Sequence, residues 1–156
     1  MRKKDREITD INKIENIISR CHCCRLGFCD NGHAYIVPMN FGYVNDNGKY
    51  TFYFHSANEG RKIDLIKENP HAGFELDTNF ELNEGDEACD YSARFQSVIG
   101  NGVISFVNGF EEKKTGLNLI MEHYTGKKEW TYDEKMINAV CIFKLEINEL
   151  SCKEHL

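Results

Sequence analysis

Apolar residues recur with two different periods along this chain, and each period predicts a different kind of element. Segment 8–21 carries isoleucines three or four positions apart, which is the spacing of one helix face. An amphipathic helix is therefore predicted there, with Thr9 or Asp10 as its N-cap. The same kind of spacing predicts a short helix over residues 60–69 and a longer one over 110–124.

Between these helices the apolar residues come in short runs, which predict β-strands. Hairpin turn signals at 30–32 (Asp-Asn-Gly) and 45–48 (Asn-Asp-Asn-Gly) join three consecutive runs into an antiparallel meander. Later strands are predicted at 72–76, 93–107 and 139–150, with a bulge or bend where Gly100 and Gly102 interrupt the second of them. Many short strands with three helices in the connections predict a mainly β fold, a small barrel with flanking helices.

Residues 77–91 contain six acids and no base, so a solvated surface loop is predicted there. No repeat or low-complexity segment divides the chain. Its 156 residues are expected to form one domain spanning 1–156.

The overall charge and hydropathy limit the possible partners. The formal net charge is −6, which argues against nucleic-acid binding, where a basic face is expected. No apolar run reaches the roughly 20 residues of a membrane helix, and no signal peptide is visible after the charged segment 1–6, so a cytoplasmic location and no membrane association are expected. Seven cysteines with no secretory signal indicate reduced thiols.

One stretch raises a chemical question: residues 52–62, FYFHSANEGRK, begin as a buried strand and end as a helix start with paired cations. Backbone N–H groups point outward at a helix N-terminus, which also carries partial positive charge. Arg61 and Lys62 would add a bidentate donor and a point charge, a compact site for a phosphate. The alternative is an ordinary solvated helix start. His55 beside it is either an active-site group or a structural hydrogen-bonder.

Two other stretches could line a pocket. Pro38 removes a ladder hydrogen bond inside an apolar strand, and Asn40 follows it, so the freed backbone could face a flat heterocycle; an edge strand with a bulge is the alternative. Gln96 and Ser97 are polar residues that enter a β run, facing either solvent or a pocket. The cysteines at 21–29 include one C-x-x-C but no second matched pair, so no metal site is predicted.

In their order along the chain, the segments 35–43 (YIVPMNFGY), 52–70 (FYFHSANEGRKIDLIKENP) and 96–102 (QSVIGNG), with a following helix, resemble the flavin-binding split-barrel proteins of the pyridoxamine 5′-phosphate oxidase superfamily. The nearest branch is that of the nitroimidazole-resistance proteins. The resemblance covers about residues 8–147. It implies a six-stranded antiparallel split barrel that forms a homodimer and binds FMN, or FAD in some members, at the interface.

The resemblance also implies roles for particular residues. Pro38, Met39, Asn40 and Phe41 would lie along the isoalloxazine ring, with His55 and Ser56 near it. Arg61 and Lys62 would hold the 5′-phosphate, and Gln96 and Ser97 would contribute from the other side of the dimer interface. His55 would be the catalytic residue. Family members commonly have arginine where Gln96 stands, so one charge is missing here. The C-terminal substrate-phosphate region of the true oxidases is also absent, so oxidation of pyridoxamine phosphate is not expected.

The function that this resemblance implies is that of a flavin-dependent reductase acting on nitroaromatic or similar small acceptors. A non-catalytic module that stores or senses flavin and a haem-binding split barrel are the alternatives. Binding of nucleic acid or of a membrane is not expected.

Overall fold

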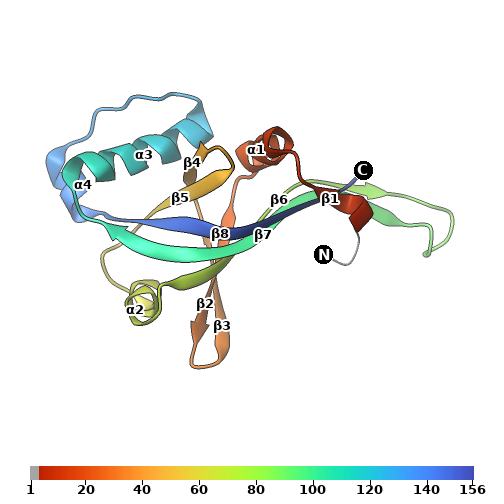
Figure 1. Cartoon of the computed structure of the whole chain (residues 1–156), viewed down its shortest axis with the longest axis horizontal. Coiled ribbons are helices and arrows are strands. Elements are labelled where there is room, and N and C mark those ends of the chain that lie inside the picture. The colour runs from red at the N-terminus through yellow and green to blue at the C-terminus, as the bar shows by residue number, and fades with distance from the viewer. Residues whose placement is uncertain (1–3) are drawn as a thin grey trace.

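The computed structural model describes residues 4–156 and shows one curved antiparallel sheet flanked by helices (Figure 1). The strands are β1 (Glu7–Ile8), β2 (Cys24–Asp30), β3 (His33–Met39), β4 (Gly42–Asp46), β5 (Lys49–Ser56), β6 (His71–Asn83), β7 (Ser92–Val107) and β8 (Cys141–His155). The helices are α1 (Ile11–Arg20), α2 (Arg61–Glu68), α3 (Phe110–Thr125) and α4 (Glu134–Ala139), with a 3₁₀ turn η1 at Lys4–Arg6.

The three predicted helices are present, and local chemistry explains their bounds. Asp10 is the N-cap of α1, and its side chain accepts hydrogen bonds from the backbone N–H groups of Asn12 and Lys13. Ile8, which shares the isoleucine spacing, belongs to β1 instead and pairs with Cys152. The short helix α4 was not predicted.

Both predicted hairpin turns are confirmed, because Asn31 and Gly32, and likewise Asn47 and Gly48, have positive φ angles. Two successive positive φ angles are the mark of a type I′ turn, whose twist matches that of the strands it joins. The predicted irregularity near Gly102 is also confirmed, since the β7–β8 register shifts between Asn101 and Gly102.

The sheet follows the order β3-β2-β6-β7-β8-β5-β4, with β1 added beside β8. Its two edges, β3 and β4, are consecutive in the sequence and are separated only at Asn40–Phe41. The segment formed by β3 and β4 therefore bends at this break: β3 pairs with β2, and β4 pairs with β5. This is the geometry of a split barrel. The expected split barrel is thus confirmed; it has eight strands rather than six because this segment counts as two and β1 adds another.

The helices cover different parts of this sheet (Figure 1). Helices α1 and α3 lie above it in this view, and α2 lies below, beside the β2–β3 hairpin. Helix α3 approaches β4 closely: a Cβ atom on Gly42 would come within 2.3 Å of the Leu119 backbone, so only glycine fits there. The core contains Phe41, Phe52 and Phe143, which are fully buried.

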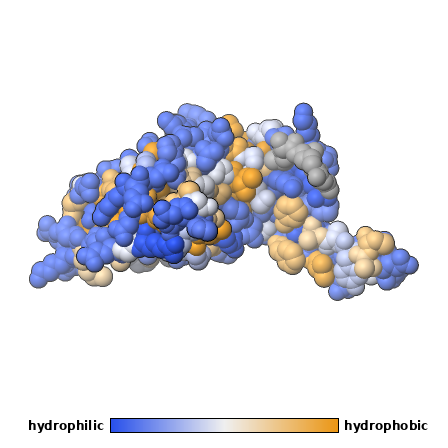
Figure 2. Space-filling view, turned by 90° about the horizontal axis from the view of Figure 1, so that it is seen from below, coloured by the Kyte–Doolittle hydropathy of each residue, from blue (hydrophilic) through white to orange (hydrophobic). Residues whose placement is uncertain are grey.

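The acidic segment 77–91 is not simply a loop, and that prediction is wrong in its first half. Strand β6 continues to Asn83, and only residues 84–91 connect it to β7. The β6–β7 hairpin extends from the body as an arm, which carries hydrophobic residues on its surface (Figure 2). Phe80 and Leu82 are 73% and 51% exposed there. Alternating apolar residues at 80 and 82 were the overlooked strand signal.

Within residues 4–156, none of the helices is both long enough and apolar enough to cross a membrane.

Candidate functional site

The N-terminus of α2 leaves backbone donors open to a ligand. Gly60 is its N-cap, with a φ angle of 125°, and no side chain caps the helix. The Gly60 carbonyl accepts from the N–H groups of Ile63 and Asp64, at 2.8 and 3.1 Å. The first N–H groups of the helix, those of Arg61 and Lys62, precede this ladder and have no intrahelical acceptor. This end of α2 therefore suits an anion, and the phosphate site at Arg61 and Lys62 stays a prediction.

Arg61 extends from this helix start to the β2–β3 hairpin. Its Nε donates to Asp30 Oδ2 at 2.7 Å, its Nη2 pairs with the same oxygen, and its guanidinium lies 4.6 Å from the centroid of the Tyr35 ring. The Arg61 side chain is still 61% exposed. The cation is thus held in place with donors left over for a ligand. Neither Asp30 nor Tyr35 was predicted, because their role depends on how α2 packs against the hairpin.

Lys62 points to the strand break. Its Nζ lies 3.6 Å from Met39 Sδ, which brings the second cation to the end of β3. Burial lowers the pKa of Lys62, an effect partly offset by Cys141. A half-buried ammonium without a carboxylate partner among the described residues gains from a bound anion.

His55 and Ser56 end β5 beside these cations. They pair with Ile142 and Cys141 of β8, and the Ser56 hydroxyl donates to the Ala57 carbonyl at 2.9 Å. His55 is exposed at the surface, and its pKa is lowered by partial burial and then by the charge of Lys62. At neutral pH the imidazole is therefore mostly uncharged.

Pro38 and Met39 end β3, and Asn40 and Phe41 form the break before β4; β3 is an edge strand, which is one of the places expected for Pro38. Pro38 and Asn40 are exposed, whereas Met39 and Phe41 are buried. The backbone N–H of Phe41 is not free: it donates to the Tyr124 hydroxyl at 3.2 Å. A ligand at this break would thus meet exposed edges of Pro38 and Asn40 rather than the Phe41 ring.

Gln96 and Ser97 lie far from this cluster within the same chain. Ser97 pairs with Lys153 of β8, whereas His55 pairs with Ile142 of the same strand. Eleven residues of strand separate these positions, roughly 35 Å at 3.3 Å per residue.

The Gln96 side chain is buried, 6% exposed, in a network of polar groups. Its Oε1 accepts from Arg20 Nη2 at 2.8 Å and Asn79 Nδ2 at 2.9 Å, and its Nε2 donates to Glu154 Oε2 at 3.0 Å. Glu154 in turn pairs with Lys13. Within one chain, Gln96 joins α1 to β6, β7 and β8.

The cysteines are free thiols, and burial raises the pKa of Cys21 to about 12 and that of Cys152 to about 11. The thiols of Cys21 and Cys152 are therefore un-ionised at neutral pH and unreactive. Among residues 4–156, no group of three or more His, Cys, Asp or Glu side chains could hold a metal ion.

The cluster around His55, Arg61 and Lys62 is an open surface in the single chain. Two cavities of the described part of the chain lie away from it: one of about 340 Å³ between α1, β4 and α3, and one of about 500 Å³ at the base of the β6–β7 arm. A flavin held at the cluster would therefore need another wall.

The comparisons with known proteins agree with this fold. The family model described as pyridoxamine 5′-phosphate oxidase matches residues 10–154. A candidate 5-nitroimidazole antibiotic resistance protein from Bacteroides thetaiotaomicron is 34% identical, with a TM-score of 0.82 over 95% of this chain and 86% of that one. No curated protein matches this sequence.

Two more distant structures share the fold alone. A flavocytochrome from Azotobacter vinelandii is 19% identical, with a TM-score of 0.80 over 100% of this chain and 72% of that one. An FAD and heme binding protein from Mycobacterium smegmatis is 15% identical, with a TM-score of 0.83 over 96% of this chain and 73% of that one.

Proposed function

This chain belongs to the pyridoxamine 5′-phosphate oxidase family, and from that premise we propose that it is a flavin-dependent reductase that binds FMN and reduces small nitroaromatic acceptors. One observation supports this most strongly. The uncapped start of α2, with Arg61 and Lys62, meets the strand break through the contact of Lys62 Nζ with Met39 Sδ at 3.6 Å. A phosphate site thus adjoins backbone suited to a flat ring.

The proposed roles follow from these contacts. Arg61 and Lys62 bind the phosphate, together with the first N–H groups of α2. Pro38 and Asn40 face the ring system. When bound, the flavin supplies the redox step, as hydride or as single electrons. FAD is the alternative cofactor.

His55 is proposed to supply a proton or a hydrogen bond to the acceptor. Its pKa is lowered partly by Lys62. A phosphate bound at Lys62 would neutralise that charge and allow the His55 pKa to rise again. The loaded site is therefore expected to hold a better proton donor than the empty one.

We also propose a homodimer in which a second copy provides the missing wall. The sheet presents a flat face of β2, β3, β6 and β7, where Gly27 pairs with both Ile36 and Gly73. Ile36 and Ile99 on these strands are 62% and 53% exposed. A shallow hollow of about 310 Å³, lined in part by Gly27, Ile36 and Gly73, lies on this face and suits a symmetry-related copy. Ser97 would reach the cofactor from that second copy.

The cofactor is tested first, by the absorption spectrum and the released-ligand mass of the purified protein. Flavin bands and the mass of FMN are expected. A haem spectrum would support the haem-binding alternative, and protein that stays colourless after incubation with FMN would refute flavin binding. Reduction by NADH or NADPH followed by reoxidation with a 5-nitroimidazole tests the activity; bound flavin without reoxidation would indicate a storage module.

The dimer is tested by light scattering of the parent, Ile36→Lys and Met136→Lys proteins. Met136 is 72% exposed on α4, away from the flat face, and serves as the control. The parent and the Met136→Lys variant are expected to be dimers, whereas the Ile36→Lys variant is expected to be a monomer. A monomeric parent with flavin bound would refute the dimer.

A further inference from the structure

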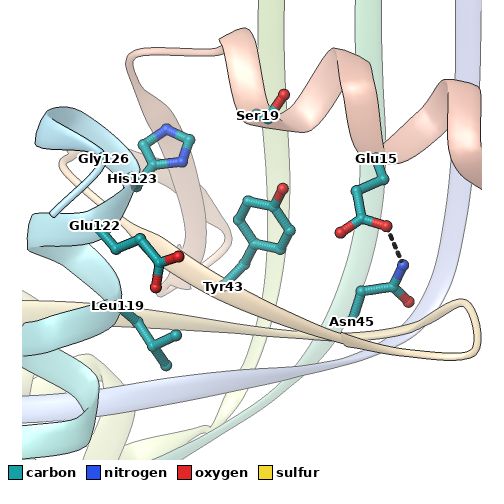
Figure 3. A pocket seen from close by; sticks show the side chains of 8 residues that line it. All are labelled: Glu15, Ser19, Tyr43, Asn45, Leu119, Glu122, His123 and Gly126. Carbon is teal, nitrogen blue, oxygen red and sulfur yellow. Dashed lines mark hydrogen bonds between the residues drawn. The ribbon is translucent and has the colours of Figure 1, made fainter. Parts of the chain in front are cut away.

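A second pocket lies between α1, β4 and α3, on the face of the sheet away from α2 (Figures 1 and 3). Its volume is about 340 Å³, within the usual range for small-molecule sites. The polar side chains that line it are Glu15, Ser19, Tyr43, Asn45, Glu122 and His123. None of them belongs to the proposed flavin site.

The lining carries two carboxylates and no lysine or arginine. Glu15 enters from α1 and Glu122 from α3, with the Tyr43 ring between them (Figure 3). Burial, followed by the charges of Glu15 and Glu122, raises the pKa of Tyr43 to about 12. Helix α3 also ends here, at Gly126, so the negative end of its dipole faces the same space.

His123 adds an acceptor rather than a positive charge. Its Nε2 lies 2.7 Å from the Cys21 carbonyl oxygen, and since a carbonyl can only accept, Nε2 carries the proton. Burial lowers the pKa of His123, so the ring is neutral at pH 7 and Nδ1 keeps its lone pair. The neutral ring and both carboxylates thus all favour a ligand that donates hydrogen bonds.

The arrangement does not suit a metal ion. Among residues 4–156, no three acidic, histidine or cysteine side chains converge closely enough to bind one. Glu15 already accepts from Asn45 Nδ2 at 2.7 Å, and Glu122 pairs at 3.5 Å with Lys128, whose side chain is 79% exposed. A ligand that reaches both carboxylates must therefore contain several atoms.

A buried hydroxyl without a hydrogen-bond partner lies in the core next to the pocket lining. Tyr50 is only 3% exposed, and its hydroxyl has no hydrogen-bond partner in the described chain. Tyr50 pairs directly with Asn45 across β4 and β5, so its side chain shares the face on which Asn45 lines the pocket. Burial, followed by the charge of Glu15, raises the pKa of Tyr50 to about 12. An unsatisfied buried hydroxyl is costly, and this one lies on the same face of the sheet as the pocket.

From this geometry we propose that the pocket binds a small organic cation, an amidinium with an apolar body. The cationic group pairs with Glu122 and Glu15, and the apolar body packs against the Tyr43 ring. The outermost ion pair, Glu122 with Lys128, opens when the ligand enters.

The proposal is tested by calorimetric titration of the purified protein with benzamidine, its neutral isostere benzamide, and benzoate. Benzamidine is expected to bind at least about tenfold more tightly than either of the others, since a charge-assisted hydrogen bond is lost in both. Glu122→Gln and Glu15→Gln are each expected to weaken benzamidine binding by about tenfold or more. Lys128→Met frees Glu122 and is expected to strengthen binding.

Glu111→Gln is the matched control, because Glu111 lies in the first turn of α3, at the opposite end of the helix from the pocket. It is expected to leave the affinity unchanged. Three outcomes would overturn the proposal: no benzamidine binding at millimolar concentration, equal binding of benzamide, or an equal loss in Glu111→Gln. If the glutamine variants fail to fold, weaker binding by Lys128→Met would also overturn it.

Discussion

The guanidinium of Arg61 lies over the ring of Tyr35, 4.6 Å from the ring centroid, and connects the first turn of α2 to the middle of β3. The same guanidinium pairs with Asp30 on the neighbouring strand β2. The Arg61 side chain is therefore oriented before any ligand arrives, which reduces the entropy lost when an anion binds.

We predict that Arg61→Ala weakens FMN binding by roughly 10- to 150-fold, because one charge-assisted contact to the phosphate is lost. The affinity for riboflavin, which lacks the phosphate, should fall much less. Fluorescence titration of both flavins gives the two affinities. Lys67→Ala, at the far end of the same helix, is the control. Equal weakening of both flavins would show that Arg61 does not bind the phosphate.

His55→Ala separates a catalytic from a structural histidine. As a proton donor, His55 can be replaced without loss of flavin binding, while reoxidation of prereduced protein by a nitroaromatic slows by roughly 10²–10⁴. Stopped-flow absorbance measures that rate. Because the imidazole can donate a proton only when it is protonated, the rate of the parent should rise as the pH falls toward the His55 pKa, and the rate of the variant should not rise in this way. A variant that reoxidises as fast as the parent refutes the catalytic role.

The Gln96→Met variant tests whether Gln96 stabilises the fold through its polar network or binds the cofactor. Methionine keeps the volume but leaves Arg20, Asn79 and Glu154 without their shared partner. The free energy of unfolding of the flavin-free protein should fall by about 1–3 kcal/mol. Urea denaturation measures this, with Asn101→Met, an exposed β7 residue, as the control. An unchanged stability together with weaker FMN binding would assign Gln96 to the cofactor instead.

Acidification should destabilise the protein partly through His123. Burial lowers its pKa in the folded state, so between that value and the unfolded value of about 6.5 the unfolded chain binds more protons. The contribution of His123 to the free energy of unfolding is therefore fully present above about pH 6.5. It declines as the pH falls, until the pH is below the pKa of His123 in the folded state. Urea midpoints at several pH values should decline less steeply in His123→Gln. Identical slopes for variant and parent would contradict this assignment.

The sequence alone determined the fold class and one half of the candidate site. Turn chemistry fixes the two hairpins locally, since Asn-Gly sequences adopt the positive φ angles that a type I′ turn needs. The cationic start of α2 could likewise be predicted, because Gly60, Arg61 and Lys62 are adjacent in the chain.

Only the tertiary structure decided which distant residues meet. Asp30 and Tyr35 orient Arg61, and Gln96 joins a network with Arg20 and Glu154, although the local sequence of these residues does not identify their partners. These partnerships depend on strand register and on how each helix packs against the sheet. Long-range packing sets both, whereas hydrophobic periodicity reports only which face of an element is buried.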